Sequence, residues 1–445
     1  MMKQKGNTAQ FILTLLLIFV LFESPQLISE VIPSGMQENA VLSNTDSSNA
    51  GARGAFFTGK YTNLFKDLLG KSDKQIDEKI TGAFKQLFLG DDNTQRIYYP
   101  VGDDMGYIED INNNDVRTEG MSYGMMIAVQ MDKKNIFDRL WIWTSTYMQH
   151  KSGQHAGYFS WHCRTDGSVI DSNSASDGEE WFATALYFAS ARWGDGEGIF
   201  NYKAEADKIL NAMLNKKDSS DSRHVVTNMF NKKEKMVVFV PTGSADDFTD
   251  PSYHLPHYYE VWARVADKNN GFWCDAVSAS RDFLKKAANP KTGLFPDYAN
   301  FDGTPADPWG GGKGNFSFDA WRVAMNIALD YEWFGKDEWE VEENNRLLNF
   351  FYSKGVNTYS NQYTLAGKEI PGDHSTGLVA MNAAACLAAT IPQRKDFVQA
   401  LWNAEIPQGH YRYYDGVLYM MGLLQVSGNF KAYVPAGVNN GGCSK

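Results

Sequence analysis

An acidic residue in a glycine-containing stretch is the first candidate for chemistry. Residues 115–125, DVRTEGMSYGM, place Glu119 between Arg117 and Gly120, directly before a run with helical spacing. Glycine lets a backbone approach a ligand closely, and a carboxylic acid beside it is suited to general acid catalysis. A structural explanation also exists, because a glutamate in the first turn of a helix is stabilised by the helix dipole. These eleven residues alone favour the structural explanation, so the rest of the chain must decide.

Two further carboxylates occupy comparable positions. Asp177 in SDGEEW and Asp319 in FSFDAWRV each open a strongly apolar helical run. Isolated acids at helix starts are usually caps. Three on equivalent helices, each beside aromatic residues, would converge on one cleft. Hydrolysis of a glycosidic bond needs such a set: one acid protonates the leaving oxygen, and one carboxylate deprotonates water or attacks the sugar carbon.

The elements that must position these carboxylates are helices. A capping box at Ser72–Gln75 opens an amphipathic helix that ends at Gly90. Ten further helices are predicted at 121–130, 136–149, 179–193, 203–214, 258–267, 274–288, 319–334, 338–352, 376–389 and 416–424. Some are apolar on every side, and the intervening ones are amphipathic and charged, which indicates an inner ring covered by an outer ring. We therefore expect an all-α fold, an (α/α)6 toroid of inner and outer helices, formed by one catalytic domain at 56–435 with a C-terminal tail at 436–445.

Composition narrows the ligand class. The net charge of −11, with both signs mixed along the chain, argues against nucleic acid, whose phosphates require a basic face. Aromatic residues make up 14% of the chain, including 12 Trp and 22 Tyr. Some of them must belong to the core, but Trp and Tyr also suit flat, partly apolar ligands such as sugars.

The N-terminus has the pattern of an export signal. Lys3 and Lys5 precede an apolar run at 11–22, which is too short to span a bilayer comfortably. We expect a signal peptide or signal anchor at 1–29 and a polar linker at 30–55. The protein is then exported, either periplasmic or secreted, with no other membrane segment. Export permits disulfides, but four widely spaced cysteines do not form a disulfide framework, and Cys386 reads as a buried thiol.

No cofactor and no metal are expected. His254 and His257 are three residues apart without an HExxH motif, which is a weak metal signal. A structural or sugar-contacting role is favoured for both. The chain has no phosphate-binding glycine loop and no Ser-His-Asp signature.

The acidic blocks resemble those of glycoside hydrolase family 8. The resemblance covers about residues 56–433 and implies that Glu119 is the general acid and Asp319 the general base. It also implies that Asp177 contacts the sugar in the central subsite. Two further blocks, DPSYHLP and RYYDG, imply site tyrosines at Tyr253 and Tyr414, and YFSWHC implies a stacking tryptophan at Trp161.

Within this family the chain looks most like the enzymes that release xylose from the reducing end of xylo-oligosaccharides. Those enzymes carry a Leu-His-Pro loop that closes the cleft beyond the reducing-end xylose. Here the corresponding stretch is PGDHSTG, in which His374 matches while Asp373 and Ser375 replace leucine and proline. His374 could instead be a polar helix-start residue, and the alternatives are an endo-acting xylanase, a β-glucanase or a chitosanase. A binding protein without catalysis, or another α/α toroid enzyme such as a uronic-acid hydrolase, is a further alternative.

The resemblance also implies an inverting mechanism and a xylo-oligosaccharide substrate, and we expect the protein to be a monomer. Glu119 must then be protonated at working pH, and Asp319 must be ionised and hold a water. The two carboxyl groups are expected about 6.5–9.5 Å apart. Arg322, one helical turn after Asp319, is expected to bind substrate and to keep Asp319 ionised, although it could equally pair with an outer carboxylate.

Overall fold

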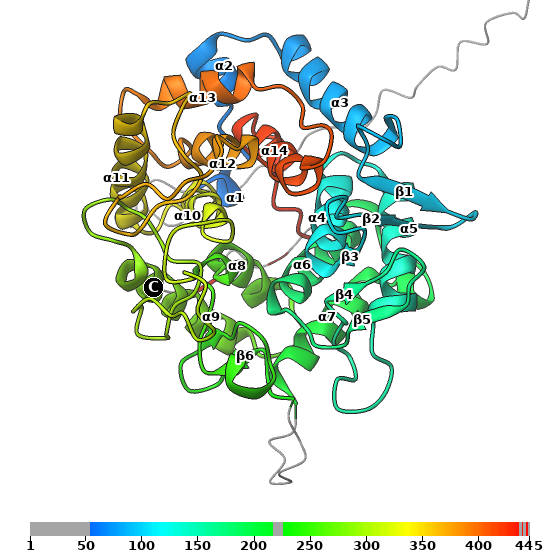
Figure 1. Cartoon of the computed structure of the whole chain (residues 1–445). Helices are drawn as coiled ribbons and strands as arrows, with labels where there is room; N and C mark the ends of the chain where they lie inside the picture. Colours follow the sequence, from blue (N-terminus) through cyan, green and yellow to red (C-terminus); the bar gives the residue numbers. More distant parts are fainter. Residues whose placement is uncertain (1–53, 217–225, 436–437, 439–441, 444–445) are drawn as a thin grey trace, which may run out of the picture. The chain divides into compact units, whose positions relative to one another are not determined.

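Six nearly fully buried helices surround a common centre in the computed structural model (Figure 1), which describes residues 54–216, 226–435, 438 and 442–443. They are α4 (Thr118–Gln130), α6 (Ser176–Trp193), α8 (Pro256–Val265), α10 (Trp321–Phe334), α12 (Thr376–Ala385) and α14 (Arg412–Val426). Each packs on the next in chain order, and α14 packs on α4, which closes the ring. Their apolar sequences follow from this position, since a neighbouring helix covers each side.

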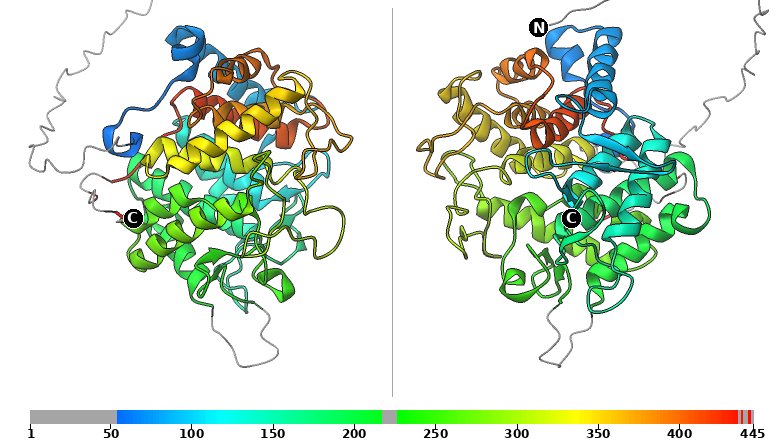
Figure 2. Two further views of the ribbon diagram at one scale, coloured as in Figure 1. Left: turned by 90° about the vertical axis from the view of Figure 1, so that its left-hand side faces the viewer. Right: turned by 45° about the vertical axis from the view of Figure 1, so that its right-hand side comes forward.

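The second layer consists of amphipathic helices. These are α3 (Asp73–Leu89), α5 (Lys134–Trp143), α7 (Tyr202–Leu214), α9 (Asn270–Ala287), α11 (Glu338–Lys354) and α13 (Arg394–Asn403). In α4, 12 of 13 residues are buried, whereas in α13 only 3 of 10 are. Figure 2 shows the side of the ring that carries α9 and α11. The predicted (α/α)6 arrangement is confirmed.

Shorter elements complete the described part of the chain. Two small helices, α1 (Ala55–Thr58) and α2 (Leu64–Leu69), precede α3. The strands are β1 (Tyr98–Val101), β2 (Met105–Ile108), β3 (Val116–Arg117), β4 (His162–Cys163), β5 (Val169–Asp171), β6 (Phe230–Asn231) and β7 (Met236–Val237). They form antiparallel sheets in the orders β1-β2, β3-β4-β5 and β6-β7. The three-stranded sheet leads directly into α4, so it fixes the start of the helix that carries Glu119.

Two helix predictions differ from the structure, and one outer helix was not predicted. The helix predicted at 136–149 is α-helical only to Trp143, after which Thr144–Met148 forms a π turn. The helix predicted at 376–389 ends at Ala385, because residues 386–389 make tighter turns. Helix α13 was not predicted, since its three buried residues are too few for a periodic signal.

The N-terminal segment is outside this description. The predicted signal at 1–29 and nearly all of the linker lie outside the described residues, so both stay predictions. No helix within the described residues has the length and apolar character needed to cross a bilayer.

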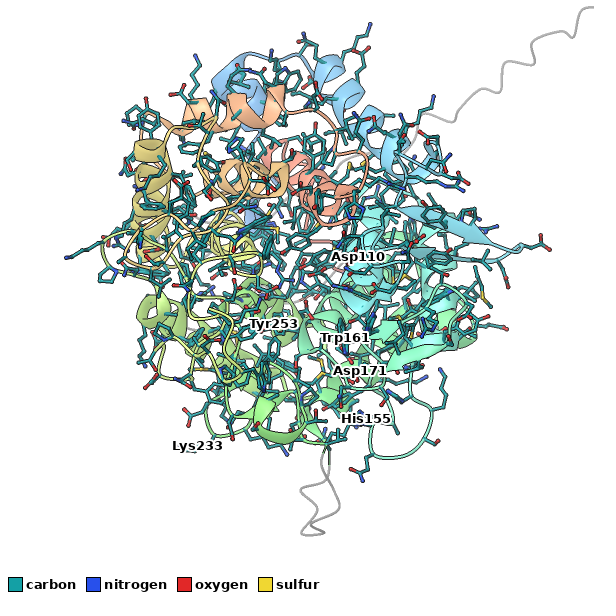
Figure 3. The ribbon with its side chains drawn as sticks, in the orientation of Figure 1. Asp110, His155, Trp161, Asp171, Lys233 and Tyr253 are labelled. Atoms are coloured by element: carbon teal, nitrogen blue, oxygen red, sulfur yellow. A yellow bond between two sulfur atoms is a disulfide. The ribbon has the colours of Figure 1, made fainter. Side chains whose placement is uncertain are left out.

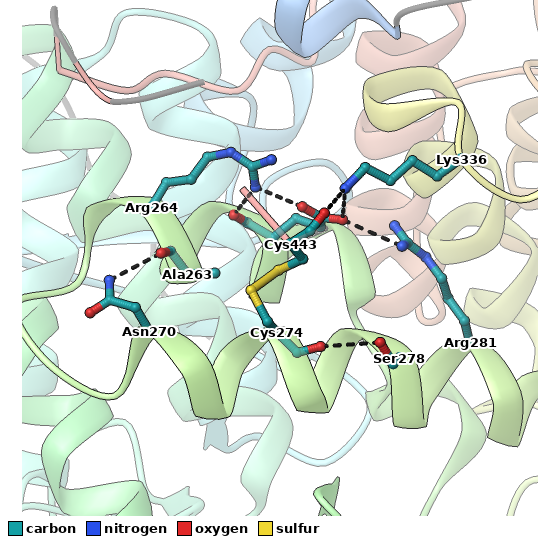
Figure 4. Close-up of a disulfide and its surroundings, with 9 residues drawn as sticks. Ala263, Arg264, Asn270, Cys274, Ser278, Arg281, Lys336 and Cys443 are labelled. Atoms are coloured by element: carbon teal, nitrogen blue, oxygen red, sulfur yellow. Dashed lines mark hydrogen bonds and ion pairs between the residues drawn. A yellow bond between two sulfur atoms is a disulfide. The ribbon is translucent and has the colours of Figure 1, made fainter. Parts of the chain in front are cut away.

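A disulfide ties the C-terminal segment to the outer layer (Figure 4). Cys443, within the predicted tail, is bonded to Cys274 on α9, across 169 residues of sequence. Lys336 Nζ donates a hydrogen bond to the Cys443 carbonyl at 2.9 Å. Cys163 and Cys386 are free and buried, as predicted for Cys386.

Removing this disulfide is expected to destabilise the domain. A cross-link over a long loop restricts the unfolded chain, so the Cys274→Ser/Cys443→Ser variant should lose about 2–4 kcal/mol of unfolding free energy. Thermal unfolding with and without a reductant checks this. The reductant should lower the unfolding temperature of the wild type and leave the double variant unchanged. A wild type that is insensitive to the reductant would contradict the assignment.

Candidate active site

The N-terminal ends of the inner helices supply the predicted site residues. Glu119 and Asp177 lie in the first turns of α4 and α6, and Asp319 lies two residues before α10 begins. Tyr253 ends the short turn Pro251–Tyr253 that precedes α8, and Tyr414 is in the first turn of α14. His374 lies two residues before α12. Every inner helix therefore contributes one of these residues at the same end of the ring.

These residues line a cleft that consists of two connected chambers. The first, of about 510 Å³, contains Trp161, Asp177, Tyr253 and Arg322. The second, of about 760 Å³, contains His374 and Tyr414. Glu119 and Asp319 line both, so the two candidate catalytic carboxylates stand at the junction. In Figure 3, Tyr253 lies near the centre of the ring with Trp161 and Asp171 beside it, whereas His155 and Lys233 lie at the periphery.

Arg322 is the hub of the site. Its side chain is 2% exposed. Nη1 donates hydrogen bonds to Glu119 Oε2 (3.0 Å), Asp177 Oδ2 (3.2 Å) and Tyr123 Oη (2.9 Å). Nη2 donates a hydrogen bond to Asp319 Oδ1 (3.1 Å). The predicted contact with Asp319 is present, and it is one of several. A planar guanidinium with a fixed fork of donors can hold several carboxylates at set angles, which an ammonium cannot do. Glu119 and Asp319 bind different nitrogens and are thereby kept apart.

A second cation reaches Asp319. Lys313 Nζ lies 3.4 Å from Asp319 Oδ2 and 3.1 Å from Asp297 Oδ2. Asp297 is fully buried and also accepts hydrogen bonds from the backbone N–H groups of Ser317 and Ala320. Asp297 therefore holds the turn that carries Asp319 in place, and two cations, Lys313 and Arg322, flank the Asp319 carboxylate.

The candidate acid, Glu119, lies between Arg322 and Tyr413. Burial raises the pKa of Glu119 above its ordinary value; the charge of Arg322 opposes this rise and the charge of Asp319 adds to it. Tyr413 donates a hydrogen bond to Glu119 Oε1 at 2.9 Å, which favours the ionised form. Tyr413 reaches this position because the residue after Glu119 is Gly120, where a Cβ would lie 2.7 Å from the tyrosine ring. A raised pKa suits a group that must deliver a proton.

The Asp177 carboxyl also has a raised pKa. Burial raises the pKa of Asp177 to about 7; Arg322 lowers it, and the charges of Glu119 and Asp319 raise it. Its Oδ1 accepts the N–H of Gly178 at 2.9 Å. The nearby carboxyl of Asp250 is fully buried, and its pKa is raised well above the usual range by burial and by the charge of Asp319. Three buried carboxyl groups with raised pKa values, those of Glu119, Asp177 and Asp250, therefore lie around one arginine.

Replacing Tyr413 by Phe is expected to move the alkaline limb of the pH profile upward. The tyrosine hydroxyl stabilises ionised Glu119, so its loss raises the Glu119 pKa further, and the acid stays protonated to higher pH. The dependence of kcat/KM on pH measures this. Tyr419→Phe removes a hydroxyl that lies away from the cleft, bonded to the Ala404 carbonyl, and should leave the limb in place. An alkaline limb that moves downward in Tyr413→Phe would contradict the assignment.

Aromatic residues form the walls of both chambers. Trp161 stacks on His162, with ring centroids 4.5 Å apart, and faces the first chamber. Tyr253 is 6% exposed, and its ring lies 5.7 Å from the Arg322 guanidinium. Tyr414 donates to the Phe318 carbonyl at 2.8 Å, which turns its ring toward the second chamber. Each of the predicted sugar-contacting aromatics therefore lines the cleft.

His374 lies in the wall of the second chamber. Its Nδ1 hydrogen-bonds with the Tyr359 carbonyl at 2.9 Å, and its ring packs edge-on against the Tyr359 ring. The side chain is exposed to the cleft, as are its neighbours Gly372 and Asp373. Ser375 is the N-cap of α12, so His374 lies both at a helix start and in the wall of the cleft.

Several residues at the site were not singled out from sequence. Tyr413 contacts Glu119, Tyr123 contacts Arg322, and Lys313 contacts Asp319. Tyr413 was adjacent to the predicted Tyr414, but neighbouring helical residues point about 100° apart, and the sequence does not say which faces the acid. The two histidines of YHLPH lie in the core, where His254 bonds to Thr249 and Ser280. Within the described ranges no group of three His, Cys, Asp or Glu side chains is placed to hold a metal.

Comparison with known proteins adds independent findings. The signature of Glycosyl hydrolases family 8 matches residues 101–428. The chain is 47% identical to a reducing-end xylose-releasing exo-oligoxylanase of Paenibacillus barcinonensis, covering 86% of this chain and 100% of that protein. The solved structure of that protein with xylose superposes with a TM-score of 0.81 over the same shares. A xylobiose complex from Teredinibacter turnerae is 49% identical with a TM-score of 0.83, covering 86% of this chain and 100% of that one.

Proposed function

Because the chain belongs to glycosyl hydrolases family 8, we propose that it hydrolyses the β-1,4 bonds of xylo-oligosaccharides and releases xylose from the reducing end. The observation that carries the proposal is the position of Glu119 and Asp319. Both line the junction of the two chambers, on different nitrogens of Arg322. Relatives that are 47% identical and bear the name of this activity support the substrate class.

The proposed reaction is a single displacement. Protonated Glu119 gives its proton to the glycosidic oxygen, and the bond between that oxygen and the anomeric carbon breaks. Asp319 takes a proton from a water whose oxygen bonds to the anomeric carbon from the opposite face. One water is consumed and the configuration inverts. Afterwards Glu119 is ionised and Asp319 protonated, and exchange of protons with solvent restores both.

The two chambers then have different occupants. The first chamber, with Trp161, Asp177 and Tyr253, holds the sugars on the non-reducing side of the bond. Arg322 neutralises the carboxylates that surround the reacting sugar. The second chamber holds the leaving xylose, and His374 stands in its wall.

Endo action is the second candidate, and a specific observation favours it. The second chamber is the larger, at about 760 Å³ against 510 Å³. Asp373 and Ser375 stand where leucine and proline would complete the wall, so the cleft could accept more than one sugar beyond the bond.

Product analysis of xylotetraose and of its borohydride-reduced form tests the proposal. Release of xylose and xylotriose from the first substrate, with little cleavage of the second, supports reading of the reducing end. Xylobiose as the main product, with the reduced substrate cut equally well, would establish endo action instead. No cleavage of any xylo-oligosaccharide would overturn both.

We also propose that the protein is exported and acts as a monomer. The apolar N-terminal run supports export, and so does the Cys274–Cys443 disulfide, because disulfides persist in oxidising compartments. Fractionation of the producing cells, with N-terminal sequencing and mass measurement of the product, tests this. A cytoplasmic protein with reduced cysteines would exclude export, and a stable dimer would exclude the monomer.

A further inference from the structure

An exposed tryptophan at the rim of the first chamber has no part in the reaction described above. Trp309 lines this chamber and is 61% exposed, although it is among the most apolar side chains. Exposure of this degree leaves much of the indole surface available to a ligand.

Trp309 packs against an aromatic cluster, of which Phe239 and Tyr298 also line the first chamber. Phe248 lies 5.4 Å from its ring and Tyr298 lies 6.1 Å away, both nearly perpendicular to it. Phe239 is the third neighbour, at 5.9 Å, and packs in turn on Phe248 and Tyr298. Packing of this kind restricts the orientation of the indole, while 61% of the residue stays exposed at the chamber.

Hydrogen bonds and an ion pair connect the loop that carries Trp309 to Asp319, the proposed general base. The Asp307 carboxylate accepts hydrogen bonds from the N–H groups of Gly312 (3.0 Å) and Lys313 (3.2 Å), which closes the loop around the tryptophan. Gly310, Gly311 and Gly312 adopt φ values of 74°, 95° and 84°, so the reversal depends on glycine. Lys313 then reaches Asp319 at 3.4 Å. These contacts, all within a short stretch of sequence, fix the position of the indole relative to Asp319.

Polar groups accompany Trp309 in the lining of the chamber. Asp171, Asn173 and Thr242 lie along it, together with Trp161. Figure 3 places Asp171 and Trp161 side by side. An aromatic face combined with carboxylate, amide and hydroxyl groups suits a ring that has an apolar face and a rim of hydroxyls, which is the chemistry of a neutral pyranose.

We propose that Trp309 is the stacking platform of a distal subsite, which binds a sugar unit of the substrate on the non-reducing side, beyond the unit at Asp177. The inference rests on the proposed function, since it takes the first chamber as the non-reducing side. It makes Trp309 a determinant of chain-length preference. Chains too short to reach it gain nothing from it.

The test is a chain-length series from xylobiose to xylohexaose with Trp309→Ala. The variant should match the wild type on the shortest substrates. On longer substrates its kcat/KM should fall about two- to tenfold, mainly through a higher KM, because this is the fold-change that the loss of one aromatic contact produces. Trp309→Phe should recover part of the loss. Tyr352→Ala, which removes an exposed aromatic of the outer helix α11, should behave as the wild type at every length.

Calorimetry of the same oligosaccharides in a Glu119→Gln background provides a readout independent of turnover. Adding Trp309→Ala to this background should weaken the binding of long chains and leave the binding of short chains unchanged. Equal losses at all lengths, or no loss at any length while the wild type cleaves the substrates, would overturn the platform alone. If the wild type neither cleaves nor binds xylo-oligosaccharides, the proposed function fails, and cello-oligosaccharides of the same lengths replace them. A loss confined to long cello-oligosaccharides would still support the platform, and its absence would overturn it.

Discussion

Glu119→Gln and Asp319→Asn are each expected to lower kcat/KM on xylotetraose by about 10²- to 10⁴-fold, the contribution of a positioned general acid or base. Both changes keep the shape of the side chain. The glutamine of the first variant can still bond with Arg322 and Tyr413 through its amide, but it has no proton of comparable acidity to deliver. The asparagine of the second variant retains a contact with the arginine, but its amide cannot accept a proton from water. Initial rates measure the loss, and circular dichroism with thermal unfolding shows that the fold is intact.

Glu332→Gln is the matched control for these variants. Glu332 lies near the far end of α10, where its carboxylate accepts hydrogen bonds from Thr62. Its replacement should leave turnover unchanged. Unimpaired turnover in Glu119→Gln or Asp319→Asn would remove that residue from the mechanism, whatever the control shows.

Replacing Arg322 by Met should destabilise the fold as well as abolish activity. The guanidinium is buried among Glu119, Asp177 and Asp319, and Asp250 Oδ2 lies 4.0 Å from it. Removing one partner of a buried ionic group leaves uncompensated charge, at a cost of about 3–5 kcal/mol of unfolding free energy. Denaturant unfolding at several pH values measures the loss.

The pH dependence of this loss has a defined sign. Burial raises the pKa of Glu119 and of Asp177 in the folded protein, and Arg322 opposes both rises. A group whose folded pKa lies above its unfolded pKa loses stabilisation as the pH increases through the folded value. Without Arg322 the folded pKa values rise further, so the deficit should be larger at neutral and alkaline pH than in acid.

Arg322→Lys is the matched variant. It keeps one positive charge and should recover part of the stability. It should not recover activity, because one ammonium cannot bond several carboxylates in fixed directions. A deficit that grows toward acid pH, or full activity in Arg322→Lys, would contradict the role of the arginine.

The sequence predicts which layer each helix belongs to, because inner and outer helices differ in how their apolar residues are distributed around the helix. Inner helices such as α4 are apolar all round, and outer helices such as α11 have one apolar face. The two-residue strands β3 and β4 are too short for an alternation signal, although they fix the start of α4. Pairing of Cys274 with Cys443 depends on a Cα–Cα distance of 5.1 Å that only the folded chain provides.

The site could be predicted where a residue type is required by the chemistry, and less well where it is required by geometry. Glu119, Asp177 and Asp319 are acids at helix starts, so both type and place were readable. Lys313 and Tyr413 act through side chains that cross from other elements, and nothing in their local sequence indicates this. The separation of the Glu119 and Asp319 carboxyls stays a prediction of about 6.5–9.5 Å.

Time-resolved proton NMR of xylotetraose hydrolysis distinguishes a single displacement from a double displacement. It follows the released xylose and the anomeric configuration of the new reducing end on xylotriose before mutarotation mixes the anomers. We expect equal amounts of xylose and xylotriose, with the new reducing end appearing first as the α anomer. Initial formation of the β anomer would contradict the assignment of Asp319 as a base that activates water, since that outcome requires a covalent intermediate.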